Sequence, residues 1–282
     1  MKKIRIDQLL VERELAPTRA KAQALVMAGV VFCGTQKIEK SSQTFEPSAP
    51  IHVKQKDHPY VGRGGVKLKA ALDYFKYPIA EKICLDVGAS TGGFTDCLLQ
   101  AGAKKVYALD VGYGQLDSRL RNDPRVVVLE KINFRNYDFK DLTNPIDVVT
   151  VDVSFISLEL ILPKVAELFQ KKVNAQAFDN STLLTTGPIG FDSAQPPVPE
   201  RSRRTGTHSE KYLIALIKPQ FEVGPKNVGK GGVVTSEEKR SEAVLKIKHL
   251  CEKLGFKIDE IIPSPLKGAQ GNVEYLLGGT LL

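Results

Sequence analysis

The sequence contains no tryptophan and only four cysteines and four histidines among its 282 residues. The cysteines, Cys33, Cys84, Cys97 and Cys251, form no Cys-x-x-Cys pair and have no histidine partners at the spacing typical of metal sites. We therefore expect buried or incidental thiols. The sequence predicts neither a zinc site nor a redox centre, and no bound metal.

Long apolar segments are also missing. The first residues, Met1 to Asp7, are basic, but a charged helical pattern follows them instead of the apolar core of a secretory signal. No stretch reaches the ~20 apolar residues that cross a bilayer as a helix. These absences predict a cytoplasmic protein and give no support to a membrane pore.

Positive charge is in surplus, and it is concentrated at the front of the chain. Lys and Arg number 40 against 32 Asp and Glu, a formal net charge of +8. Residues 1–69 hold thirteen of these bases and six of the acids, so they account for seven of the eight surplus charges. Such a surplus favours a polyanionic partner such as nucleic acid, and it assigns that partner to the front of the chain.

A small α+β module is predicted over residues 1–58. Apolar residues stand at helical spacing among charges, and glycines and prolines then separate short β-prone stretches. The predicted elements are helices over residues 7–14 and from a Thr18 cap to Gly29, and strands over 30–33 and 51–53. So few residues can bury only a thin core.

A second, larger domain is predicted over residues 67–282. Residues 59–66 contain three glycines and a proline, so we place a linker there, followed by a helix from Lys67 to Tyr74. The next predicted strands are residues 83–87, 106–110, 126–130, 148–152 and 213–218, and the helices are 94–100, 158–169 and 237–254. Fully apolar strands that alternate with helices predict an α/β fold with a mostly parallel sheet covered on both faces.

Residues 173–210 interrupt this alternation. They are rich in Pro, Ser, Thr, Gly and Arg and show no apolar period, so they are interpreted as a surface loop or a disordered insertion. The basic run at 201–204 could contact RNA, although a solvated charge run is the more frequent explanation.

A glycine-rich turn follows the first predicted strand of the large domain, at residues 85–95. Gly88, Gly92 and Gly93 allow the backbone to approach a ligand where a strand enters a helix. Their spacing is GxxxGG, which differs from the GxGxxG of dinucleotide sites. Asp110 ends the next strand, where it can accept hydrogen bonds from a ribose diol. Together these features favour an adenosyl ligand without a pyrophosphate, such as S-adenosylmethionine, over a turn that binds nothing.

Four charged residues are expected to meet at the carboxyl ends of the strands, where open α/β sheets bind their ligands. Asp152 and Lys218 each end an apolar strand, Glu274 begins a final apolar segment, and Lys67 comes from the first helix of the domain. Each alone is more often a surface charge. Because desolvated charges need partners or a chemical task, the four together favour a catalytic cluster.

The sequence as a whole resembles the TlyA (haemolysin A) family of ribosomal RNA 2′-O-methyltransferases. The front module is similar through Ile-Arg-Ile-Asp-Gln-Leu-Leu at 4–10 and Thr-Arg-Ala-Lys-Ala-Gln-Ala-Leu-Val at 18–26. The larger domain is similar through 60–68, 86–96, 111–116, 152–158, 216–223 and 271–275. The resemblance covers nearly the whole chain and implies a module like that of ribosomal small-subunit protein four, followed by a Rossmann-like, FtsJ-like methyltransferase domain.

The resemblance also implies roles for individual residues. The expected catalytic residues are Lys67, Asp152, Lys218 and Glu274. The expected S-adenosylmethionine contacts are Asp86, Gly88, Ala89, Ser90, Gly92, Gly93, Phe94, Asp110 and Asp152. In the front module, RNA phosphates and 2′-hydroxyls are expected to contact Arg5, Arg13, Arg19, Lys21 and Lys37, although any one of these could equally be an ordinary surface charge.

Two features depart from the family pattern. The insertion at 173–210 replaces a short turn, and because it enters the next strand at its amino end, we expect it to leave catalysis intact. Ser118 stands where an aromatic residue, usually tryptophan, is expected, which puts a packing or stacking contact near the substrate in doubt.

A mechanism follows as a hypothesis. A ribose hydroxyl is a weak nucleophile, so it must be aligned with the methyl group and relieved of its proton. Burial and neighbouring positive charge would favour the neutral amine of Lys218 as base or principal polariser, oriented by Asp152, while Lys67 and Glu274 complete the charge network. Two alternatives remain: an RNA-binding assembly factor with a silent methyltransferase fold, and a haemolysin, as the family's older name suggests.

Overall fold

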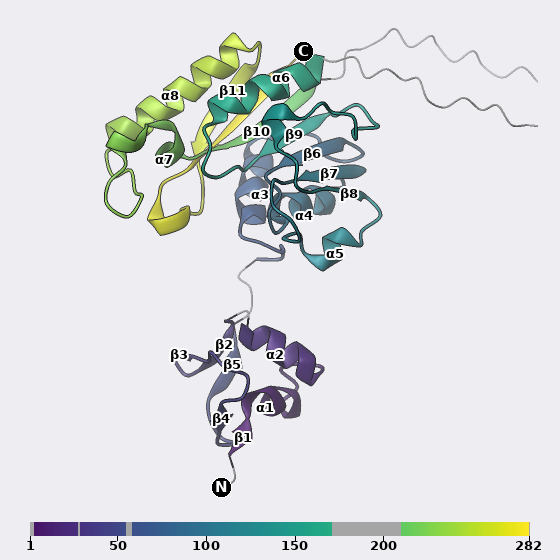
Figure 1. Ribbon diagram of the computed structural model, residues 1–282, viewed down its shortest axis with the longest axis vertical. Helices are drawn as coiled ribbons and strands as arrows, with labels where there is room; N and C mark the ends of the chain where they lie inside the picture. Colours follow the sequence, from purple (N-terminus) through teal and green to yellow (C-terminus); the bar gives the residue numbers. More distant parts are fainter. Residues whose placement is uncertain (1–2, 28, 55–57, 171–209, 282) are drawn as a thin grey trace, which may run out of the picture. The chain divides into compact units, whose positions relative to one another are not determined.

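The computed structural model describes residues 3–27, 29–54, 58–170 and 210–281 (Figure 1). The chain divides into two compact units, residues 1–59 and 60–282, and each is described by itself.

The first unit is a small α+β module. Its elements are β1 (Ile4–Arg5), α1 (Ile6–Glu12), α2 (Arg19–Met27), β2 (Val31–Cys33), β3 (Gln36–Lys37), β4 (Thr44–Phe45) and β5 (Ile51–Val53). β1 pairs with β4, and β2 lies between β3 and β5, all antiparallel. The backbone N–H of Lys21 donates to Thr18 Oγ1 at 3.2 Å, so Thr18 caps α2 as predicted. Ile6, Leu9, Leu10 and Val26 form the core with the strands.

The second unit is built around a seven-stranded sheet with the order β11-β12-β10-β9-β6-β7-β8. Its strands are β6 (Ile83–Val87), β7 (Lys105–Leu109), β8 (Val126–Leu129), β9 (Val148–Val151), β10 (Lys211–Ile217), β11 (Lys257–Pro263) and β12 (Tyr275–Leu281). β6 to β10 run parallel to one another, and β12 runs antiparallel to both of its neighbours. The predicted α/β fold with a mostly parallel sheet is confirmed.

Helices cover both faces of this sheet (Figure 1). They are α3 (Gly64–Phe75), α4 (Gly93–Gln100), α5 (Ser118–Arg121), α6 (Leu162–Gln170), α7 (Pro219–Glu222) and α8 (Glu237–Lys253), with 3₁₀ turns η1 (Phe134–Asn136), η2 (Leu158–Leu160), η3 (Pro225–Asn227) and η4 (Ala269–Gly271). Alternate residues of β10 point to opposite faces, so Leu213 packs with α6 and α8 while Ile214 packs with α3 and α4. This two-sided burial explains the uniformly apolar strands.

The predicted linker at 59–66 is wrong for most of its length. Tyr60 is buried in the core of the second unit, and α3 begins at Gly64 instead of Lys67. A Cβ on Gly65 would lie 2.2 Å from the Tyr60 ring. The glycines therefore permit close packing at this point instead of giving the chain a flexible joint.

The last two strands, β11 and β12, form an antiparallel edge that the sequence pattern predicted only in part. The apolar residues of β12 were recognised, but β11 was missed because Lys257, Asp259 and Glu260 interrupt its apolar pattern. Charged residues on an edge strand discourage pairing with other chains.

The predicted insertion at 173–210 lies outside the described residues except for Glu210. The described elements nearest to it in the chain are α6, which ends at Gln170, and β10, which begins at Lys211. Lys218 follows the opposite end of β10, and seven residues of strand span about 23 Å.

Replacing residues 175–208 with a short glycine-serine linker should therefore preserve the expected S-adenosylmethionine binding. Each halving of the loop length removes about 0.6 kcal/mol of closure entropy, so the free energy of unfolding should stay the same or rise by about 1 kcal/mol. Denaturant unfolding and calorimetric titration of the cofactor measure both effects. A folded deletion protein that no longer binds the cofactor would contradict this placement.

Candidate active site

The sheet brings three of the four predicted catalytic residues to one edge. Asp152 directly follows β9 and Lys218 directly follows β10, and these two strands are parallel neighbours. Glu274 directly precedes β12, which is antiparallel to β10, and Ile217 pairs with Tyr275. The start of β12 therefore lies at the same edge as the end of β10. Lys67 reaches this edge from the first turn of α3.

The four side chains form two ion pairs. Lys218 Nζ lies 2.8 Å from Asp152 Oδ1, and Lys67 Nζ lies 2.5 Å from Glu274 Oε2. The side chains are 2% to 20% exposed, Glu274 least and Asp152 most. Charges this far removed from water are stable only when they are paired, so the structure supplies the partners that the sequence analysis required.

All four residues line one cavity of about 590 Å³. Arg63, Lys267 and Gln220 also line it, together with the aromatic residues Phe155 and Phe221. Its two carboxylates, Asp152 and Glu274, are each balanced by a lysine. Arg63 and Lys267 therefore give the cavity a surplus of positive charge. A cavity of this kind suits an anionic ligand.

A second cavity, of about 490 Å³, meets the first at Asp152, Ser154 and Phe155, which line both. Its polar lining comes from the glycine turn and the end of β7, through Gly88, Ser90, Asp110 and Gln115. Its apolar wall is formed by Val87, Leu109, Val111, Ile132, Phe134, Val153, Ile156 and Ile161, with Asn133 beside them. Two cavities with a shared wall can hold a donor and an acceptor side by side.

Gly88 and Asp110 shape the second cavity. Gly88 has a φ of +88°, and a Cβ there would lie 2.6 Å from the carbonyl oxygen of Asp152, so only glycine fits. The Asp110 carboxylate accepts the backbone N–H of Ser90 at 2.8 Å and that of Gly112 at 2.7 Å. A carboxylate has about four acceptor positions, so Asp110 can order the turn and still accept ligand hydroxyls.

Five of the predicted cofactor contacts do not line the second cavity. Ala89, Gly92, Gly93 and Phe94 face the core instead. A Cβ on Gly92 would lie 2.2 Å from Leu120, and one on Gly93 would lie 2.9 Å from the backbone nitrogen of Gly65. These two glycines allow α5 and the start of α3 to pack closely. The sequence spacing was informative, but only its first glycine faces the cavity.

Asp86 is the fifth of these residues. It is fully buried within β6 and accepts hydrogen bonds from Thr95 Oγ1 at 2.7 Å and Thr150 Oγ1 at 3.1 Å. Burial raises the pKa of Asp86 to about 7. Its carboxyl group therefore stabilises the residues around the glycine turn and does not line the cavity.

Sequence reasoning missed the residues just after Asp152. Phe155 is 92% exposed, has a φ of +63° and lies with its ring 5.4 Å from that of Phe221. Ser154 Oγ accepts a hydrogen bond from Lys218 at 2.8 Å. The available signal was the Asp-Val-Ser-Phe-Ile-Ser run itself, in which polar and aromatic residues follow a strand-end acid. Ser118, the other departure noted above, is exposed at the start of α5 and lines neither cavity.

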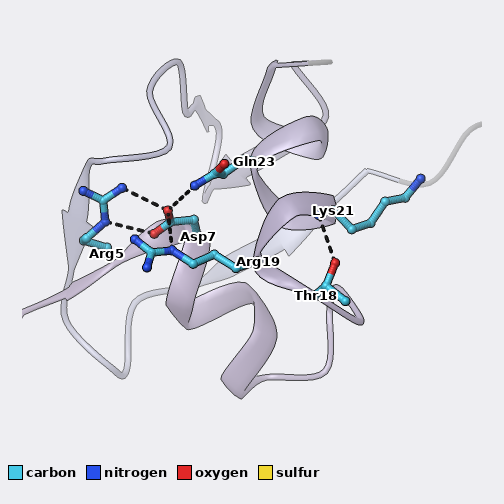
Figure 2. Close-up of polar contacts among 6 residues, drawn as sticks. All are labelled: Arg5, Asp7, Thr18, Arg19, Lys21 and Gln23. Atoms are coloured by element: carbon cyan, nitrogen blue, oxygen red, sulfur yellow. Dashed lines mark hydrogen bonds and ion pairs between the residues drawn. The ribbon is translucent and has the colours of Figure 1, made fainter.

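In the first unit, two of the predicted RNA-binding arginines share one buried carboxylate (Figure 2). Asp7 is fully buried and accepts hydrogen bonds from Arg5 at 2.9 Å, Arg19 at 3.0 Å and Gln23 at 2.9 Å. The Arg5 guanidinium, helped by Gln23 and Arg19, holds the pKa of Asp7 well below its usual range. Arg5 and Arg19 remain 38% and 51% exposed, so both can contact another molecule while Asp7 fixes their orientation.

The other three predicted RNA contacts differ among themselves. Arg13 donates to the backbone carbonyls of Ala49, at 2.8 Å, and Pro47, so it ties the end of α1 to the segment before β5. Lys37 is exposed, and its side chain crosses Gly29, where a Cβ would lie 2.5 Å from its Nζ. Lys21 is exposed and extends away from the Asp7 network (Figure 2). The observed contacts of Arg13 therefore stabilise the fold of the module, whereas Lys21 is a solvent-accessible cation.

No group of three or more His, Cys, Asp or Glu residues among the described residues is arranged to hold a metal ion. No helix in the described part of the chain is long and apolar enough to cross a membrane.

Comparison with known proteins assigns both units to families. A family model described as "FtsJ-like methyltransferase" matches residues 60–281, and one described as "S4 domain" matches residues 4–51. YqxC of Bacillus subtilis (strain 168) is 39% identical over 277 residues, covering 98% of this chain and 85% of that protein.

Two further relatives extend the comparison. The 16S/23S rRNA (cytidine-2′-O)-methyltransferase TlyA of Mycobacterium tuberculosis (strain H37Rv) is 37% identical over 277 residues, covering 98% of this chain and 89% of that protein. A solved structure from Streptococcus thermophilus, titled as a haemolysin, is 33% identical with a TM-score of 0.65, covering 100% of this chain and 89% of that one. The chain therefore belongs to the TlyA (haemolysin A) family, in which an S4 domain precedes an FtsJ-like methyltransferase domain.

Proposed function

We propose that this protein transfers a methyl group from S-adenosylmethionine to a ribose 2′-hydroxyl of ribosomal RNA. The observation that carries the proposal is the junction of the two cavities at Asp152, with Lys218 paired to Asp152 on the side of the larger cavity. The name of the mycobacterial relative supports both the ribose hydroxyl and ribosomal RNA as the target.

The smaller cavity fits S-adenosylmethionine. Gly88 lines it with backbone alone, Asp110 can accept the ribose hydroxyls, and the apolar wall suits an adenine ring. Asp152 Oδ1 lies at ion-pair distance from Lys218 but accepts no well-aligned hydrogen bond among the described residues. An anionic oxygen in that position suits a positively charged sulfonium nearby.

The larger cavity would hold the target nucleotide. When bound, S-adenosylmethionine supplies an electrophilic methyl group on a positively charged sulfur. Asp152 and Lys218 would align the 2′-hydroxyl in the shared wall, which is the main requirement of a displacement between two bound reactants. Lys218 Nζ would first give one proton to solvent, so that it carries a lone pair. The hydroxyl proton would then pass to this lone pair as the oxygen–methyl bond forms and the methyl–sulfur bond breaks with its electrons left on sulfur. The Lys67–Glu274 pair would hold part of the cavity wall, and Arg63 and Lys267 would supply positive charge toward the RNA backbone.

Two other functions are weighed against this proposal. A catalytically inactive methyltransferase fold that only binds RNA would not require two nearly buried ion pairs around an accessible cavity. Such pairs cost desolvation energy, and without catalysis nothing would offset that cost. The haemolysin title of the Streptococcus thermophilus structure raises the other possibility. Incubating the purified protein with erythrocytes would test that activity directly.

The function is tested with ribosomal subunits from cells that lack the protein. Incubation with S-adenosylmethionine labelled in its methyl group, followed by nuclease digestion, should give labelled 2′-O-methylnucleoside. Mapping should place the label at defined riboses. Label on bases only, or no transfer to either subunit, would overturn the proposal.

Asp110→Ala should weaken S-adenosylmethionine binding by about 1 to 3 kcal/mol, because it removes the ribose hydrogen bonds and releases the turn at Ser90 and Gly112. Calorimetric titration measures the loss. Asp123→Ala is the matched control, since Asp123 pairs with Arg125 at the surface and lines neither cavity. Equal affinity of the Asp110 variant and the wild type would remove Asp110 from the site.

Lys21→Ala should weaken binding of the full chain to ribosomal RNA and reduce the slope of log affinity against log salt by about 0.7 to 0.9, the value of one phosphate contact. Arg13→Ala should leave that slope unchanged and lower the free energy of unfolding by about 1 to 2 kcal/mol, because its backbone hydrogen bonds are lost. Salt titrations and denaturant unfolding distinguish the two. An unchanged slope for the lysine variant would exclude Lys21 from the RNA contact.

Lys218→Ala should slow the chemical step on the order of 100-fold or more while cofactor and RNA affinities are kept. Lys218→Arg keeps the positive charge but cannot give up a proton, so it separates proton transfer from charge stabilisation. Single-turnover methylation with both substrates saturating measures the step. Lys211→Ala, at the other end of β10, is the control and should react at the wild-type rate. Near wild-type rates for both Lys218 variants would rule out Lys218 as the catalytic residue.

A further inference from the structure

The position of Lys218 Nζ is defined by two acceptors. Asp152 Oδ1 and Ser154 Oγ each lie 2.8 Å from it. A lysine nitrogen carries three positions besides its carbon, whether as three N–H bonds or as two N–H bonds and a lone pair. The hydrogen bond to Ser154 takes one of these positions, and the ion pair with Asp152 restrains the nitrogen from a second side. Because Lys218 also lines the larger cavity, the third position is the one available to a bound hydroxyl.

One acceptor would not be enough to aim this third position. The ion pair with Asp152 fixes a distance but no N–H direction, so with Asp152 alone the nitrogen could still rotate about the bond to its carbon. A second fixed acceptor removes that freedom, in the way that outer residues orient a catalytic group by hydrogen bonds. Ser154 is the residue that supplies the second acceptor, and it lines both cavities.

The loop that carries Ser154 is held mainly by side chains from the segment after β10. Among the described residues, no backbone N–H of residues 153–157 donates to a backbone carbonyl. Instead, Lys218 contacts Ser154, the ring of Phe221 lies against that of Phe155, and Glu222 accepts the Ser157 hydroxyl at 2.5 Å and the Leu158 N–H at 2.9 Å. Glu222 itself is only 6% exposed.

This loop also contains backbone strain beside Ser154. Phe155 has a φ of +63°, a conformation that is costly for a bulky residue. Such strain persists only where the surrounding contacts over-determine it, and it is concentrated at functional sites. The contacts from α7 therefore hold Ser154 at a fixed place relative to Lys218, which begins the same segment.

We infer that Ser154 is a positioning residue that, together with Asp152, aims the free position of Lys218 Nζ at the reacting hydroxyl. The inference rests on the proposed function. In the reaction, the bond between the hydroxyl oxygen and the methyl group forms as the methyl–sulfur bond breaks and leaves its electron pair on sulfur. The hydroxyl proton goes to the lone pair of the neutral Lys218 amine, while the hydrogen bond to Ser154 and the contact with Asp152 stay in place. Ser154 neither gains nor loses a proton in this step.

The test compares Ser154→Ala and Ser154→Thr in the full chain, on the ribosomal subunits and riboses identified by the mapping experiment. Ser154→Ala should slow single turnover about 10-fold or more, since small misplacements of a reacting group carry large rate penalties. Its KM for RNA and its affinity for S-adenosylmethionine should stay within about twofold, and its melting temperature should not change. Ser154→Thr restores the hydroxyl and should recover most of the rate.

Two further proteins complete the design. Ser118→Ala removes an exposed serine that lines neither cavity, and it should react like the wild type. The double variant Lys218→Ala/Ser154→Ala should be no slower than Lys218→Ala alone, because a residue that acts only through Lys218 has no effect once Lys218 is gone.

Several results would overturn the inference while the proposed function stands. They are a wild-type rate for Ser154→Ala, a Ser154→Thr rate as low as that of Ser154→Ala, or a double variant slower than Lys218→Ala by the full Ser154 factor. A wild-type protein that makes no 2′-O-methylnucleoside would instead overturn the proposed function and this inference with it.

Discussion

The pairing of Lys218 with Asp152 is the interaction on which the rest of the site depends. The two residues follow neighbouring parallel strands, and the register of Ala215 against Val151 brings their side chains to the same edge. Both are largely removed from water, so neither charge is stable there without the other. The strained loop after Asp152, the segment after Lys218 and the antiparallel strand β12 are all arranged around this pair. The second pair, Lys67 with Glu274, lines the same cavity.

Much of the fold could be predicted because the residue pattern of a strand depends on how many of its faces are buried. A strand covered by helices on both faces must be apolar at nearly every position, and β6, β9 and β10 are. The prediction failed where tertiary neighbours decide the outcome. The glycines at 62, 64 and 65 suggested a linker, yet they allow Tyr60 and the start of α3 to pack tightly. β11 was missed because an exposed edge strand carries charges and has no clear apolar period.

The residues of the candidate site likewise divide into those that could be predicted from sequence and those that depend on tertiary neighbours. Asp152, Lys218 and Glu274 could be found from sequence because a charge at the end of a buried strand is chemically conspicuous. The apolar wall of the smaller cavity could not, since residues such as Ile132 and Ile161 look like any other core positions until the strand ends are brought together. Arg5 and Arg19 were predicted as RNA contacts, but the carboxylate that they share was not, because nothing in the sequence marks Asp7 as buried. The roles proposed for these residues remain predictions, whereas their contacts are established by the structure.

A common physical arrangement links the two units. In each, a buried or nearly buried carboxylate fixes a long basic side chain: Asp7 holds Arg5 and Arg19, Glu274 holds Lys67, and Asp152 holds Lys218. A free lysine or arginine loses about 2 kcal/mol of rotamer entropy when it is immobilised on a ligand. A side chain already ordered by its carboxylate loses less, at the cost of part of its charge. Asp7 pairs with two arginines, so this group of three charges keeps a net positive charge. The positive charge of Lys218 is balanced by the single negative charge of Asp152. This balance suits the proposed role of Lys218, which requires a fixed orientation of its nitrogen and not the attraction of a polyanion.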